Sequence, residues 1–149
     1  MPKITIGRSE SDLEKYGEKK ATAYIGKHLV GEKSEAHAAN TLRMDIARPH
    51  VISVFGKRGS GKSYTLGVIA EELMTAEPNI KDNLDTVIVD TMGIYWSMKH
   101  PNDRASTLLE KWDLKPQMVD TDHYIPSGQE ETFQENEIPY DYTFTLKPG

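Results

Sequence analysis

The sequence predicts an α/β fold with a parallel sheet and flanking helices, and three neighbouring stretches support this prediction. Residues 51–55, VISVF, form a short apolar run rich in β-branched side chains, which is typical of a buried strand. A glycine-rich loop and a helical pattern follow, and residues 86–89, TVIV, form a second run of the same kind. A strand, a helix and a strand at this spacing predict a βαβ unit with parallel strands and a right-handed connection.

The helix of this unit is predicted to follow Lys62. Four apolar residues are spaced at i, i+3, i+4 and i+7, which places them on one helix face: Leu66, Ile69, Ala70 and Leu73. Pro78 cannot continue a helix, so we expect the helix to end between residues 74 and 77.

The loop between the first run and the helix, GKRGSGKS at residues 56–63, matches the pattern G-x-x-x-x-G-K-[ST] at every fixed position. Glycine lets the backbone curl without Cβ clashes, so that successive N–H groups point inward. The N-terminus of the following helix adds donors and a positive dipole end, which together favour a polyphosphate. The pattern therefore predicts that the chain binds ATP and Mg²⁺.

The loop and the first helical turn supply the candidate ligand residues. Lys62 is expected to reach the β- and γ-phosphates, which also makes it a candidate catalytic residue, and the Ser63 hydroxyl is expected to bind Mg²⁺. Lys57 and Arg58 fit contacts to phosphate or to a neighbouring subunit, but two solvated charges explain them equally well. The full candidate set is Gly56, Lys57, Arg58, Gly59, Ser60, Gly61, Lys62, Ser63 and Tyr64.

Asp90 ends the second apolar run and is the second candidate catalytic residue. An acid at the carboxyl end of a strand in an open α/β sheet lies where ligands bind, so Asp90 is a candidate to hold Mg²⁺ through a water molecule. The alternative is that its carboxylate caps the turn that follows the strand. The sequence leaves both roles open.

The first 48 residues predict a lead-in and a small β element. Residues 8–20 are polar with little periodicity, which indicates a loosely packed lead-in. Residues 21–29 are typical of a strand with a bulge or close approach at Gly26, and residues 41–47 alternate apolar and polar side chains as a half-buried strand does. We therefore place a domain boundary between residues 48 and 49, with the nucleotide-binding core at 49–149.

The rest of the chain gives weaker signals. Pro101 to Asp103 offer caps for a second helix that ends at Pro116. That helix is expected to bury Leu108, Leu109 and Trp112. Three short segments are strand candidates: 117–119, 123–125 and 142–146.

Composition limits the function classes. The 149 residues carry a net charge of −5, so any DNA contact is expected to be local rather than spread over the whole surface. The sequence contains no cysteine, which excludes disulfides and thiolate metal sites. No stretch approaches the roughly 20 apolar residues of a membrane span, and the N-terminus lacks the apolar core of a signal peptide. We expect a cytoplasmic protein without a membrane partner.

Residues 50–73, HVISVFGKRGSGKSYTLGVIAEEL, followed by VIVDTMGIYWSMKHPN, resemble the HerA/FtsK-type P-loop ATPases, particularly archaeal HerA-like helicases. The resemblance is strong over residues 48–102 and faint over 21–47. It implies a small N-terminal β-barrel and a RecA-like P-loop NTPase core. It also implies a hexameric homo-oligomer that moves double-stranded DNA using ATP, with a partner nuclease acting on DNA ends.

The chain also departs from the family pattern. Asp90 and Gly93 match a D-x-x-G turn after the second strand, but Ile94 stands where many relatives have a glutamate. The resemblance implies that the Walker B acid, a sensor residue and an arginine finger lie beyond Gly149. We therefore expect the N-terminal part of a larger ATPase, with a core that is incomplete at the C-terminus.

Three functions follow from these patterns. The first is the ATP-binding portion of a HerA-like ring ATPase that translocates double-stranded DNA. The second is a nucleotide-binding switch or adaptor without turnover. The third is a small P-loop kinase, although the sequence shows no arginine-rich lid segment after the core.

Overall fold

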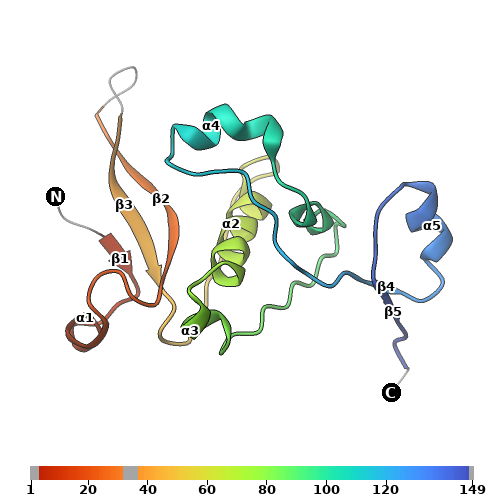
Figure 1. Ribbon diagram of the computed structural model, residues 1–149, viewed down its shortest axis with the longest axis horizontal. Helices are drawn as coiled ribbons and strands as arrows, with labels where there is room; N and C mark the ends of the chain where they lie inside the picture. The colour runs from red at the N-terminus through yellow and green to blue at the C-terminus, as the bar shows by residue number, and fades with distance from the viewer. Residues whose placement is uncertain (1–3, 32–36, 148–149) are drawn as a thin grey trace. The chain divides into compact units, whose positions relative to one another are not determined.

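The computed structural model describes residues 4–31 and 37–147. The chain forms two compact units, Met1–Thr86 and Val87–Gly149. Figure 1 labels their helices and strands. The phosphate-binding loop predicted at residues 56–63 and the helix after it belong to the first unit, together with the N-terminal β element. The predicted boundary between residues 48 and 49 stays a prediction.

A three-stranded sheet forms the N-terminal part of the first unit. Its strands are β1 (Ile4–Ile6), β2 (Thr22–Val30) and β3 (His37–Asp45), in the order β1-β3-β2. β1 pairs with β3 in parallel, and β2 pairs with β3 in the antiparallel sense. The strand predicted at 21–29 is confirmed, and a register shift next to Gly26 confirms the predicted irregularity. The strand predicted at 41–47 is also confirmed, although it starts earlier and ends at residue 45.

The prediction of a loosely packed lead-in at residues 8–20 is wrong, because helix α1 (Glu10–Tyr16) lies there. The Ser9 side chain caps the helix by accepting a hydrogen bond from the Asp12 N–H at 3.2 Å. Gly17 ends the helix with a φ of 70°, a backbone angle that favours glycine. A Ser-x-x-Asp pattern is a helix-start signal. The sequence therefore indicated the start of this helix, although the segment lacks apolar periodicity.

Helix α2 (Lys62–Met74) confirms the helix predicted after the loop. It packs against β2, and Ala70 is buried in that contact region, as the apolar stripe predicted. Leu66, another member of the stripe, is exposed. Pro78 does not continue α2 but begins a separate short helix, α3 (Pro78–Lys81), at whose first turn proline is tolerated.

The two central strands predicted at 51–55 and 86–89 do not form in the described structure. Both segments are irregular, and their apolar side chains are largely exposed: Val51 is 100% exposed and Phe55 89%. A β-branched run favours an extended backbone, but a strand also needs a neighbouring strand to take its hydrogen bonds. Among residues 4–31 and 37–147, no segment pairs with either run. The described chain is thus α/β, with small sheets instead of the predicted parallel core.

The second unit contains short elements only. They are η2 (Tyr95–Lys99), η3 (Asp103–Ala105), α4 (Ser106–Glu110), β4 (Tyr124–Pro126), α5 (Glu130–Glu135) and β5 (Tyr142–Phe144). β4 and β5 pair in parallel, which confirms the strands predicted near 123–125 and 142–146. Residues 117–119 form no strand, although Val119 is buried and its N–H donates to the Met98 carbonyl at 2.9 Å.

The second predicted helix is shorter than expected. α4 ends at Glu110 rather than at Pro116, and the chain then turns through Asp113, which has a φ of 59°. Leu108 is exposed instead of buried, so the expected apolar face does not reach a core.

No helix within the described ranges is both long enough and apolar enough to span a lipid bilayer.

Glu72 on α2 makes the polar contact between that helix and β2. Its Oε2 accepts a hydrogen bond from the backbone N–H of Tyr24 at 2.6 Å. Partial burial raises the pKa of the Glu72 carboxyl above its ordinary value, while the hydrogen bond from Tyr24 opposes this shift. The site therefore favours a neutral acceptor over a charged one.

Glu72→Gln is expected to raise the free energy of unfolding at pH 7 by less than about 1 kcal/mol, because solvent screens a half-buried charge. The amide keeps an acceptor for Tyr24 but removes the cost of burying a carboxylate. Because the folded pKa is raised, this cost is absent below the unfolded pKa and appears as pH rises through the folded pKa. The free energies of unfolding of the two proteins, measured by urea titration, should therefore converge near pH 4, and the exposed control Glu14→Gln should stay within about 0.5 kcal/mol of wild type at pH 7.

Candidate phosphate-binding site

The loop between residue 56 and α2 has the curled backbone that its glycines predict. Gly59 and Gly61 have φ values of 77° and 85°, in the left-handed region that other residues rarely adopt. Gly56 is favoured for a different reason: a Cβ there would lie 2.3 Å from the Ser60 Oγ, so the Ser60 side chain would have to shift. The Ser60 N–H donates to the Lys57 carbonyl at 3.2 Å and closes the turn. Backbone conformation therefore explains Gly59 and Gly61, and the close approach of the Ser60 side chain explains Gly56.

The N-terminus of α2 follows this loop directly. Gly61 is the N-cap residue in a left-handed conformation, and no side chain caps the helix. The first turn contains no acidic residue that would neutralise the positive end of the helix dipole. The N–H groups of a first helical turn have no acceptor within the helix itself, and helix N-termini are common anion-binding sites for this reason.

Lys62 is held across the loop that precedes it. Its Nζ donates to the Lys57 carbonyl at 2.9 Å, which places the ammonium group beside the curled backbone. Ser63 and Tyr64 belong to the same helical turn, and Tyr64 is 71% exposed. The structure thus gathers the predicted residues 56–64 on one exposed loop and turn. Their individual roles toward a ligand stay predictions.

The donor chemistry of this loop fits a polyphosphate with a bound magnesium ion. Backbone N–H groups, a positive dipole end and the Lys62 ammonium group are the donors that phosphate oxygens require. The Ser63 hydroxyl supplies the type of oxygen that magnesium prefers.

Asp90 lies in the second unit and caps its own turn. Oδ1 accepts from the Met92 N–H at 3.1 Å, and Oδ2 accepts from the N–H groups of Ile94 and Tyr95 at 2.6 and 2.8 Å. Gly93 completes the D-x-x-G turn with a φ of 62°. These contacts are the ones expected if the Asp90 carboxylate caps the turn after residue 90, which is the second role that the sequence left open. The roles of Asp90 in catalysis and in holding magnesium through water stay predictions.

A buried ion cluster in the first unit was not predicted. The Asp45 side chain is 0% exposed, and its Oδ1 accepts from the Arg8 Nε and Nη2 at 2.8 and 2.5 Å. Its Oδ2 lies 3.0 Å from the His50 Nε2. Burial raises the pKa of Asp45, but hydrogen bonds from His50 and Arg8 outweigh burial and hold the pKa below its ordinary value.

Arg8 also fixes the backbone around α1. Its guanidinium group donates to the carbonyls of Gly17, Lys20 and Ala21 at 2.6, 2.9 and 2.8 Å. The Arg8 side chain is only 1% exposed. This one buried cation donates hydrogen bonds both to the backbone carbonyls after α1 and to the Asp45 carboxylate at the end of β3. No local sequence pattern reports such a cluster, because Arg8 and Asp45 are 37 residues apart.

A second ion pair joins α1 to the segment after β3. The Asp12 Oδ1 accepts from the Arg48 Nε and Nη2 at 3.1 and 2.8 Å. The hydrogen bond from Arg48, aided by one from Ser9, lowers the pKa of Asp12. The Asp12–Arg48 pair and the Asp45–His50 contact together fix residues 48–50, which precede the loop.

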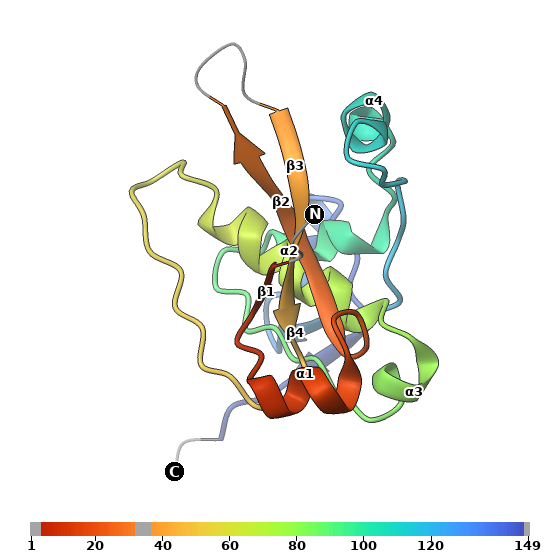
Figure 2. The same ribbon diagram turned by 90° about the vertical axis from the view of Figure 1, so that its left-hand side faces the viewer.

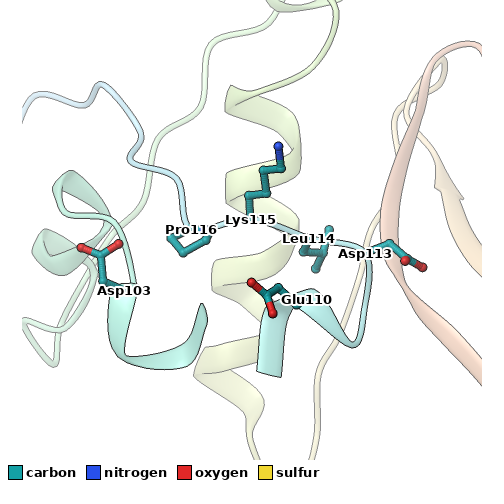
Figure 3. Close-up of a pocket in the computed structure, with 6 residues that line it drawn as sticks. All are labelled: Asp103, Glu110, Asp113, Leu114, Lys115 and Pro116. Carbon is teal, nitrogen blue, oxygen red and sulfur yellow. The ribbon is translucent and has the colours of Figure 1, made fainter. Parts of the chain in front are cut away.

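The second unit contains a separate open pocket of about 580 Å³. Its lining residues are Asp103, Glu110, Asp113, Leu114, Lys115 and Pro116. Figure 3 shows that the three carboxylates do not converge on one point. In keeping with this, no cluster of three or more potential metal ligands occurs in the part of the chain that the structure describes.

Comparison with known protein families identifies the family of this chain. No curated protein and no solved structure matches the chain significantly. The family model described as "Helicase HerA, central domain" matches residues 23–140, which are 118 of the 149 residues. This range includes the curled loop, α2 and the Asp90 turn. The chain therefore belongs to the HerA helicase central-domain family.

Proposed function

We propose that this chain is the ATP-binding portion of a HerA-like ring ATPase that translocates double-stranded DNA. The observation that carries this proposal is the loop at residues 56–63, where left-handed glycines, the uncapped N-terminus of α2 and the Lys62 ammonium group lie together. Membership of the HerA family supports an ATPase-type function.

In this proposal the residues of the loop and of the first turn of α2 divide the binding of Mg-ATP among them. The loop N–H groups and the α2 N-terminus bind the phosphate chain, and Lys62 exchanges the Lys57 carbonyl for the β- and γ-phosphates. The Ser63 hydroxyl would hold the magnesium ion, which would supply positive charge to neutralise the phosphate oxygens. Lys57, Arg58 and Tyr64 border the bound nucleotide from exposed positions.

The proposed assembly is a homo-hexamer with duplex DNA in its lumen and a nuclease as partner. Membership of a family described as a helicase central domain supports a nucleic-acid partner, and the resemblance to HerA/FtsK-type ATPases implies the hexamer. Because the chain has a net charge of −5, the DNA contact must come from a local basic surface. Light scattering with Mg-ATP and a duplex oligonucleotide tests this assembly. A ring-sized complex is expected, and a monomer under every condition would rule the ring out.

A nucleotide-binding switch without turnover is the second candidate, and the Asp90 turn favours it. Both carboxylate oxygens of Asp90 already accept backbone hydrogen bonds. Residues 91–94 contain no glutamate to orient a water molecule. An arginine finger, which is worth about 10³–10⁵ in rate in related P-loop enzymes, is not identifiable in this sequence.

A phosphate-release assay with saturating Mg-ATP tests whether the chain holds a complete hydrolytic site. We expect binding with turnover far below about one per second, the lower end of typical enzyme rates. Faster turnover that depends on Lys62 would show that the chain holds a complete hydrolytic site and would exclude the switch.

A further inference from the structure

The phosphate-binding loop lies within residues 50–72, a segment that leaves the N-terminal sheet and returns to it at one corner. We call this segment the excursion. The corner is formed by neighbouring residues of β2 and β3, where Thr22 pairs with Asp45 and Tyr24 pairs with Arg43. The chain leaves this corner at His50 and returns to it at Glu72 of α2. Figure 2 shows the connecting segment, drawn in yellow, starting beside α1 and reaching the N-terminal end of α2.

The leading end is held by His50. Its Nε2 contacts the buried Asp45, and Arg8 fixes that carboxylate from the other side. The imidazole also packs closely on Gly7, where a Cβ would lie 2.9 Å from the ring Cε1. Gly7 has a φ of 80°, so both its conformation and its small size suit this contact.

The trailing end is held by Glu72. Its Oε2 accepts the Tyr24 N–H at 2.6 Å, and α2 packs against β2 with Ala70 buried. Between the two anchors the loop residues 56–61 are exposed. We therefore expect the partly buried polar contacts at its two ends to restrain the loop more than local packing does.

We propose that His50 and Glu72 are positioning residues for the phosphate-binding loop, and that nucleotide binding is coupled through them to the β2–β3 corner. The inference rests on the proposed function, because it assigns a second set of residues to the same nucleotide site. Neither residue touches the ligand. They act by keeping the ends of the excursion together, which limits the loop to the conformations that bind phosphate.

The physical basis is a population effect. Release of either end lets the excursion sample conformations in which the loop is not curled, and apparent affinity falls in proportion to the fraction that stays competent. The coupling is reciprocal, so a bound nucleotide must stabilise the contacts at the corner by the same factor.

Calorimetric titration with Mg-ADP tests the anchors. We expect His50→Ala and Glu72→Leu each to raise the Kd about tenfold, as follows if about a tenth of the molecules remain competent. His50→Gln and Glu72→Gln keep a donor and an acceptor, and both should restore affinity to within about twofold. Met44→Val removes buried packing from the same sheet without touching either anchor, so it should lower the melting temperature and leave the Kd unchanged.

Hydrogen exchange at the Tyr24 amide gives the reciprocal measurement. Saturating Mg-ADP should slow its exchange about tenfold in the wild-type chain, and not in Glu72→Leu. Equal Kd values for His50→Ala, Glu72→Leu and Met44→Val, or an unchanged Tyr24 exchange rate with nucleotide bound, would overturn the inference alone. A wild-type chain that gives no binding heat and no exchange change anywhere would instead overturn the proposed function.

Discussion

Lys62→Ala is expected to weaken Mg-ATP binding at least about 100-fold, because one ammonium group makes several charge-assisted hydrogen bonds to phosphate. The lysine is already beside the loop, with its Nζ 2.9 Å from the Lys57 carbonyl. Binding therefore exchanges one neutral acceptor for charged phosphate oxygens without a large movement of the side chain. Alanine leaves the glycine conformations intact but removes this charge.

The measurement is calorimetric titration of both proteins with Mg-ATP and Mg-ADP, together with thermal melts. Nucleotide should raise the melting temperature of the wild-type chain by mass action, and this increase should disappear in Lys62→Ala. Lys81→Ala, which removes an exposed lysine from α3 of the same unit, is the charge-matched control and should bind normally. Equal affinities of wild type and Lys62→Ala would contradict the assignment of residues 56–63 as a nucleotide site.

Asp45→Ala is expected to be the most destabilising single change in the N-terminal sheet, at about 3–5 kcal/mol, because it leaves a buried cation without its partner. The Arg8 side chain is 1% exposed and cannot turn to solvent without losing its carbonyl acceptors after α1. His50 loses its partner as well. A loss of this size is a large part of the total stability of an ordinary domain.

Urea denaturation at several pH values measures this effect. The pKa of Asp45 is held below its ordinary value, so the stability it contributes is present above the unfolded pKa near 3.8 and is lost as pH falls through the lower folded pKa. The difference between wild type and Asp45→Ala should therefore be constant at neutral pH and shrink in strong acid. The exposed Asp85→Ala control should stay within about 0.5 kcal/mol of wild type. A similarly small change in Asp45→Ala would mean that the cluster contributes no net stability.

The sequence predicted the loop and α2 well because their signals are local. The left-handed backbone at residues 59 and 61 favours glycine, which the loop pattern supplies. The extent of α2 follows from the apolar spacing before Pro78. The same is true of α1 in retrospect, since Ser9 and Asp12 form a cap that can be recognised from four consecutive residues. Conformational preferences and caps act within a few residues of the chain, so they can be inferred without knowledge of the fold.

The failures concern partners that are distant in sequence. The run at 51–55 has strand composition, but composition does not reveal whether a second strand lies beside it. For the Arg8–Asp45 pair the sequence gives no signal at all, although the pair forms. Neither residue stands out in the sequence, yet each is buried because the other neutralises its charge. Asp90 lies between these cases, since the D-x-x-G turn was visible while the choice between capping and metal binding depends on geometry.

The exposed run at residues 51–55 has a consequence for the behaviour of this chain at high concentration. Val51 and Phe55 are almost fully accessible, and a five-residue, uncharged, β-branched segment is the kind that stacks between molecules into cross-β aggregates. Cationic side chains border the run on both sides, with Arg48 before it and Lys57 and Arg58 after it. Like-charge repulsion between neighbouring copies of these cations opposes in-register stacking, so Lys57 and Arg58 of the phosphate-binding loop are also expected to limit aggregation.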